Sequence, residues 1–199
     1  TPVFADIDPA SFNIDPAQIE AQITEKTSAI VPVHVFGNPC EVEAIQAIAD
    51  KHNLKVIYDA AHAFGSEYKG QSVLNYGDIS TLSFHATKLF HTIEGGAVIT
   101  NDDELAQKIR LLINFGITSP TTIESVGTNA KMNEFEAAMG LCVLDEIEFI
   151  RQQRANIWQT YVEHLPGLFT LQQWNEHGQN NHAYAPILFD SEEQLLKVE

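Results

Sequence analysis

Short apolar segments alternate with amphipathic segments along the first half of this sequence, and this alternation restricts the possible fold more than any other feature. Strands are predicted where apolar residues run almost without interruption, at 29–36, 54–58, 79–84 and 96–100. Helices are predicted from 42, where apolar residues recur three and four positions apart, and from the capping residue Asp102 to about Asn114. Such strands and helices are typical of an α/β fold, with a mostly parallel sheet flanked by helices.

The two ends and the second half have a different character. Residues 1–7 have the composition of a strand, whereas 118–130 are rich in Thr, Ser and Gly and are predicted to form a loop. A mostly helical stretch runs from about Asn133 to His164, with a break near Asp145, and Pro166-Gly167 ends it. A last strand at 184–189 opens a second domain. We therefore predict a large domain at 1–165 and the start of a small domain at 166–199, with both ends of the chain cut.

The overall charge restricts the partners. The 199 residues include 27 acidic and 11 basic side chains, for a net charge of −16, so a nucleic acid or an anionic membrane would be repelled. No apolar run reaches about 18 residues, the length that a membrane-spanning helix needs. Cys40 and Cys142 make no disulfide framework, and two reduced cysteines fit a cytoplasmic protein. We predict no nucleic-acid partner, no membrane partner and a cytoplasmic location.

Asp59 and Lys88 are the candidate functional residues, because each follows a predicted strand of the same sheet. Ligands of parallel sheets bind beyond the carboxyl ends of the strands. Taken alone, each is typical of a structural role, as a turn-capping aspartate or an exposed lysine. Taken together, they match what pyridoxal phosphate requires of an enzyme. A lysine amine forms a Schiff base with the cofactor aldehyde, and a carboxylate keeps the pyridine nitrogen protonated so that the ring withdraws electrons.

Further polar residues surround this pair. Ser83 and Thr87 carry hydroxyls that suit a phosphate group, although a strand-end serine and a loop threonine are an equally good interpretation. His62 lies three residues after Asp59, within reach of a cofactor hydroxyl. The spacing of the histidines matches no standard zinc pattern, so no metal site is predicted.

Five motifs in the same order and spacing resemble the DegT-type sugar aminotransferases, a family of fold type I pyridoxal-phosphate enzymes. The motifs are Val31-Pro32-Val33-His34-Val35-Phe36-Gly37, Asp59-Ala60-Ala61-His62, Ser83-Phe84-His85-Ala86-Thr87-Lys88, Glu94-Gly95-Gly96-Ala97 and Gly127-Thr128-Asn129-Ala130-Lys131-Met132-Asn133-Glu134. Together they cover about residues 1–165. The fold that the resemblance implies is the large domain of a fold type I transferase, incomplete at both ends.

The resemblance also implies a role for each site residue. Lys88 becomes the Schiff-base lysine, Asp59 the partner of the pyridine nitrogen, and His62 the neighbour of the ring hydroxyl. Ser83 becomes a phosphate ligand, and Asn129 reaches the phosphate in the neighbouring subunit of a homodimer. The implied reaction moves an amino group from glutamate to a keto sugar attached to a nucleotide.

One departure from the family pattern limits these expectations. Thr128, Ala130 and Lys131 stand where the family commonly has aromatic residues and an arginine, so substrate contacts there are not carried over. A related branch of dehydratases has histidine at the lysine position, and Lys88 argues against that branch. The alternatives are another fold type I enzyme, such as a sugar dehydratase, and a catalytically inactive fragment.

Overall fold

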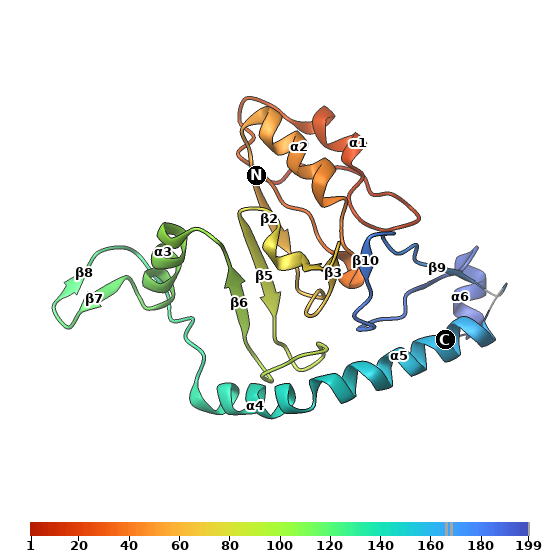
Figure 1. Cartoon of the computed structure of the whole chain (residues 1–199). Coiled ribbons are helices and arrows are strands. Elements are labelled where there is room, and N and C mark those ends of the chain that lie inside the picture. Colours follow the sequence, from red (N-terminus) through yellow and green to blue (C-terminus); the bar gives the residue numbers. More distant parts are fainter. Residues whose placement is uncertain (166, 168, 199) are drawn as a thin grey trace.

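The computed structural model describes residues 1–165, 167 and 169–198. Its central feature is a four-stranded sheet in the order β1-β2-β5-β6, formed by Ala29–Ile30, Lys55–Asp59, Ile79–Ser83 and Gly96–Ile99 (Figure 1). Strands β1, β2 and β5 are parallel, in register at Ile30 with Val56 and at Asp59 with Thr81. The mostly parallel sheet predicted from the sequence is confirmed.

Strand β6 departs from the parallel pattern. It runs antiparallel to β5, pairing Ser83 with Gly96 and Ser80 with Ile99. The segment between the two strands, 84–95, contains no helix among its described residues. A parallel connection needs a crossover that carries the chain back along the sheet, and a twelve-residue loop without a helix returns it in the opposite direction instead.

The first predicted strand is shorter in the structure than in the sequence analysis. After β1 the chain forms only an isolated bridge between Val33 and Asp59, and then a 3-10 turn, η2, at Val35–Gly37. Pro32 has no N–H to donate to a ladder, although its carbonyl accepts from the Asp59 N–H at 2.9 Å. Residues 1–7, also predicted as a strand, form a single bridge between Ile7 and Ile14.

Helix α2, Val42–His52, packs on the sheet through Val42, Ile45 and Ala49, which are fully or almost fully buried. They are three of the four positions that the spacing predicted, and the fourth, Ile48, is half-buried against the same core. They join a core made with Val56, Tyr58 and Val73 of the strands and turns around β2. Two further short elements lie beside α2 and complete this end of the molecule: α1 at Pro16–Ile19 and the 3-10 turn η1 at Glu20–Gln22.

Helix α3, Asp103–Ile113, begins where it was predicted. The Asp102 carboxylate accepts from the backbone N–H groups of Glu104 and Leu105. The loop expected at 118–130 contains a small hairpin, β7 at Ile117–Ser119 with β8 at Thr122–Ile123. Figure 1 shows α3 and this hairpin beyond β6, at the edge of the sheet.

Two consecutive helices run across the carboxyl ends of β2 and β5 (Figure 1). They are α4, Glu134–Asp145, and α5, Ile147–His164, so the predicted break near Asp145 is confirmed. Asn133 caps α4 in a capping box with Glu136. Gly140 of α4 lies against the loop after β5, where an added Cβ would be 2.8 Å from Thr92 Cγ2.

The remaining elements are short. Three short elements follow β2 in the chain: strand β3 at Glu67–Tyr68, strand β4 at Gln71–Ser72 and the 3-10 turn η3 at Val73–Asn75. Strand β10, Gly178–Gln179, joins β3 in an antiparallel pair. Strands β9, Thr170–Leu171, and β11, Ile187–Leu188, form a second antiparallel pair, followed by α6, Glu192–Val198. The predicted strand at 184–189 is thus confirmed over two residues. Pro166 lies outside the described residues.

Candidate active site

Asp59 is the last residue of β2 and is fixed there by its own backbone. Its N–H donates to Pro32 O at 2.9 Å, and its carbonyl accepts from the His34 N–H at 3.0 Å. The side chain is half-buried, and Oδ1 accepts from the Ala61 N–H at 3.0 Å. These contacts hold the carboxylate at the carboxyl end of the sheet, where the strand pattern predicted it.

Lys88 lies in the loop 84–95, which follows β5 at the same end of the sheet. The Lys88 N–H donates to His85 O at 2.9 Å, which forms a turn, and the side chain is half-buried. Two backbone bonds close the base of the loop, from Phe84 N–H to Gly95 O at 2.8 Å and from Thr92 N–H to Phe84 O at 2.9 Å. Among the described residues, no carboxylate lies within ion-pair distance of the Lys88 amine.

Three phenylalanines connect the Lys88 loop to the segment that follows Asp59. Phe90 stacks on Phe64 with ring centroids 4.5 Å apart, and meets Phe84 edge-on at 4.8 Å. Phe90 is buried, and Phe64 and Phe84 are half-buried. Since aromatic pairs have defined geometries, this cluster fixes the two site segments relative to each other.

His62 follows Asp59 by three residues and is half-buried. Burial lowers the pKa of His62, the Lys88 charge lowers it further, and the Asp59 charge opposes both. The paired strands β2 and β5 and the stacked rings of Phe64 and Phe90 bring the segment 59–64 and the Lys88 loop to the same end of the sheet. The ring contacts Tyr184, with centroids 4.5 Å apart, and lies nearly parallel to Phe36 at 5.9 Å.

The predicted hydroxyl donors lie at the edge of this group. Ser83 is the last residue of β5, and its Oγ accepts from the His85 N–H at 3.4 Å. Thr87 is exposed, and its Oγ1 lies 2.9 Å from His85 Nδ1. The Ser83 hydroxyl thus lies at the end of β5 beside a backbone N–H group, whereas the Thr87 hydroxyl contacts the side chain of His85.

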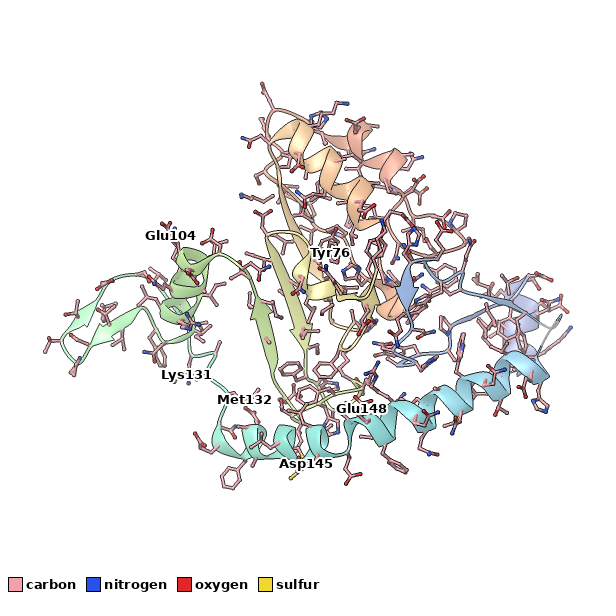
Figure 2. The ribbon with its side chains drawn as sticks, in the orientation of Figure 1. Tyr76, Glu104, Lys131, Met132, Asp145 and Glu148 are labelled. Atoms are coloured by element: carbon pink, nitrogen blue, oxygen red, sulfur yellow. The ribbon has the colours of Figure 1, made fainter. Side chains whose placement is uncertain are left out.

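Asn129 does not join the group. It forms a bridge with Asn114 beyond α3, and its Oδ1 accepts from the Lys131 amine at 2.7 Å. Figure 2 shows Lys131 and Met132 in the connection from the hairpin to α4, to one side of the sheet. The Asn129 side chain is exposed, so it faces outward from this subunit.

The gathered residues suit the ring half of pyridoxal phosphate. His62 Nδ1 is buried and has no hydrogen-bond partner among the described residues, so a polar group of a ligand would satisfy it. The Lys88 amine, which has no carboxylate partner among the described residues, matches the aldehyde of that cofactor. The Asp59 carboxylate matches its ring nitrogen, and the unpaired imidazole nitrogen of His62 matches its hydroxyl. For its phosphate, this group offers only the hydroxyl of Ser83.

A groove of about 500 Å³ lies beside the site, between α5 and residues 182–185. Its lining is mainly apolar and includes Phe149, Ile157 and Trp158. It reaches the predicted residues only through Tyr184, which also contacts His62. Asp59, His62, Ser83 and Lys88 are not among the residues that line this groove.

Several residues that shape the site were missed by the sequence analysis. Phe64 and Phe90 have the composition of core residues, and nothing in their spacing shows that they face each other. Asn181 and Tyr184 lie about 120 residues beyond His62, and their contacts are to backbone carbonyls and to a ring. Only the polar run Asn180-Asn181-His182 before an apolar strand was available as a signal.

Two structural findings limit other kinds of site. In the described ranges, no three His, Cys, Asp or Glu side chains are grouped so as to hold a metal ion. No helix there has both the length and the apolar composition to cross a bilayer.

Comparison with known proteins gives a consistent result. The model of the DegT/DnrJ/EryC1/StrS aminotransferase family matches residues 1–198. A dTDP-4-amino-4,6-dideoxy-D-glucose transaminase of Shigella dysenteriae is 48% identical over 200 residues, which is 100% of this chain and 54% of that protein. The crystal structure of DesI with its TDP-sugar product has a TM-score of 0.89 at 44% identity, over 96% of this chain and 49% of that one.

A second solved structure is also similar. PseC of Helicobacter pylori, an aminotransferase of pseudoaminic acid biosynthesis, has a TM-score of 0.91 at 36% identity and covers 100% of this chain and 55% of that one. The chain thus spans about half the length of the relatives it matches.

Proposed function

The chain belongs to the DegT/DnrJ/EryC1/StrS aminotransferase family, and on that premise we propose that the protein is an aminotransferase. The family depends on pyridoxal 5'-phosphate. The observation that supports the proposal is that Asp59 and His62 follow β2 and Lys88 follows the paired strand β5, with the two segments joined by the Phe64–Phe90 stack at one end of the sheet.

Each residue has a role that follows from its position. When bound, pyridoxal phosphate supplies an aldehyde for amino groups and an electron-withdrawing ring. Lys88 Nζ carries a proton to and from the substrate carbon as general base and acid. The Asp59 carboxylate keeps a proton on the ring nitrogen, because an adjacent negative charge favours the charged form of that nitrogen. His62 and Ser83 orient the cofactor through its hydroxyl and its phosphate.

We propose a keto sugar carried by a nucleotide as the amino acceptor and glutamate as the donor. The support is the set of relatives: two are named as transaminases of dTDP-linked and UDP-linked amino sugars, and one is named as a GDP-perosamine synthase. The retained Lys88 supports this reaction over the dehydratase alternative.

We also propose a homodimer in which Asn129 completes the site of the partner subunit. Asn129 is exposed and stands apart from Lys88 of its own chain. The helix that follows it, α4, leaves Phe135 86% and Leu141 65% exposed. A helix with apolar residues on all sides is typical of a buried location. In the same proposal, 1–165 is the cofactor-binding large domain and 166–199 begins the small domain.

The assignment of Lys88 is tested by reduction with borohydride. The whole protein is mixed with pyridoxal phosphate, reduced and digested, and the modified peptide is identified by mass spectrometry. We expect a pyridoxyl group on Lys88, and none after Lys88→Ala. Lys108→Ala, an exchange at an exposed position of α3, is the matched control and keeps the label. A label elsewhere, with Lys88 unmodified, contradicts the assignment.

The shared site is tested by mixing two inactive variants. In a mixed dimer of Lys88→Ala and Asn129→Ala subunits, one site combines the intact lysine of one subunit with the intact asparagine of the other. Random assortment puts about a quarter of all sites in this state. We expect that fraction of the wild-type formation of amino sugar from glutamate and the keto-sugar nucleotide. No recovery, with mixed dimers present, argues against a residue shared between subunits.

A further inference from the structure

We propose that Asn181 and Tyr184 are positioning residues that hold His62 in the cofactor pocket, a proposal that rests on the proposed function. The two residues belong to one short segment, 181–184, which returns to the site from the far end of the chain. Asn181 acts on the backbone of His62 and Tyr184 acts on its ring.

Asn181 is fully buried, and every polar atom of its amide is engaged. Nδ2 donates to His62 O at 2.8 Å and to Phe64 O at 3.0 Å, while Oδ1 accepts from the Ala183 N–H at 3.0 Å. One side chain thus supplies donors to two carbonyls of the segment that connects Asp59 to the phenylalanine cluster. That segment is tied to 181–184 rather than only to its own neighbours.

Gly37 shows how closely these segments approach. A Cβ at this position would lie 2.8 Å from His62 O and 2.9 Å from Asn181 Oδ1, and the backbone has φ +88°. Only glycine fits such a position without a shift of its neighbours. The turn at 35–37, the His62 segment and the segment 181–184 therefore meet without spare room.

Tyr184 covers one face of the His62 ring. Its centroid lies 4.5 Å from that of His62 and 5.5 Å from that of Phe36, which lies nearly parallel to the imidazole. Two aromatic neighbours restrict rotation of the half-buried imidazole and cover part of it. The charged groups that act on His62 are Lys88 and Asp59.

His62 Nδ1 is buried without a partner in the described part of the chain, as are His34 Nε2 and His182 Nδ1. Such an arrangement costs free energy unless a ligand supplies the hydrogen bond, and of the three histidines His62 is the one beside Asp59. The contacts of Asn181 and Tyr184 maintain this unpaired nitrogen in place, which is the behaviour expected of a preorganised binding residue.

The test uses the whole protein with Tyr184→Leu, its conservative counterpart Tyr184→Phe, and Tyr161→Leu as matched control. Tyr161 lines the adjacent groove from α5 and is 44% exposed. Two quantities are measured: the Kd of pyridoxal phosphate by absorbance titration, and the pKa of His62 by NMR in the cofactor-free protein, assigned with His62→Asn.

With Tyr184→Leu we expect the Kd to rise roughly two- to tenfold, the range that loss of one aromatic pair produces, and the pKa of His62 to rise because water reaches the ring. Tyr184→Phe restores both values, and Tyr161→Leu changes neither. Wild-type values for Tyr184→Leu overturn the proposal, as does an equal effect of Tyr161→Leu. If the wild type binds no pyridoxal phosphate, the proposed function fails. The positioning of His62 is then tested by its pKa alone, which rises in Tyr184→Leu if the proposal holds and keeps the wild-type value if it does not.

Discussion

Fully buried His34 makes the stability of this protein depend on pH in a way that can be calculated. Its ring stacks on Tyr58, with centroids 4.6 Å apart and an angle of 10° between the planes. Nδ1 accepts a hydrogen bond from the Cys40 N–H at 3.0 Å, which requires that nitrogen to be unprotonated. Burial lowers the pKa of His34 to about 3.

The sign of the effect follows from the two states of the chain. In the unfolded chain a histidine has a pKa of about 6.5, so between pH 6.5 and about 3 the unfolded state binds a proton that the folded state does not. Stability is therefore fully present above pH 6.5 and falls as the pH decreases through this window. The slope is about 1.4 kcal/mol per pH unit, which gives a loss of about 2 kcal/mol between pH 7 and pH 5.

The measurement is the free energy of unfolding by urea at pH 7 and at pH 5, for the wild type and for His34→Gln. Glutamine keeps an acceptor for the Cys40 N–H but does not titrate. We expect the wild type to lose about 2 kcal/mol more than the variant between the two pH values. His62 and His182, whose pKa values burial also lowers, contribute equally to both proteins. The matched surface exchange His177→Gln behaves as the wild type. Equal losses in wild type and His34→Gln would refute the reasoning.

Three further predictions concern other parts of the fold. Phe90→Leu removes two aromatic pairs, worth about 2 kcal/mol together, and lowers the Tm by about 4–8 °C while weakening cofactor binding. Phe169→Leu, which removes an aromatic pair outside the site, lowers the Tm without weakening cofactor binding. Weaker cofactor binding in Phe169→Leu but not in Phe90→Leu would contradict the role of the phenylalanine cluster. Burial would raise the pKa of Asp78, but Lys55 and the Val56 N–H outweigh it and lower that pKa. The stability that Asp78 adds is thus lost as the pH falls through this lowered pKa, and acid unfolding curves of Asp78→Asn lack that loss. Asp59→Ala loses most turnover with an unchanged circular dichroism spectrum, whereas wild-type kinetics would exclude its role at the ring nitrogen.

The sequence was sufficient for features that depend on local pattern. The apolar spacing of α2 and the Asp102 cap of α3 were predicted because one element alone carries each signal. The direction of β6 was not predictable in this way. Its apolar composition is the same in either direction, and only the absence of a helix in 84–95 decides the pairing.

The candidate site shows the same division. Asp59 and Lys88 were found because strand ends can be read from the sequence and meet at one edge of a parallel sheet. The supporting contacts of His62 were missed because they depend on partners far along the chain. The Asn181 amide recognises backbone carbonyls, which carry no signature in the amino-acid sequence.

The hydrogen bonds of Asn181 also determine when the pocket is completed. Asn181 is separated in the sequence from His62 by 119 positions and from Phe64 by 117 positions. During synthesis the His62 segment therefore emerges long before Asn181 does. At about 5–20 residues per second, roughly 6–24 s separate the two events. Throughout that interval the carbonyls of His62 and Phe64 lack the hydrogen bonds from the Asn181 amide, and the imidazole lacks its contact with Tyr184. The last contacts of this pocket therefore form late in folding, after the sheet that carries it has been synthesised.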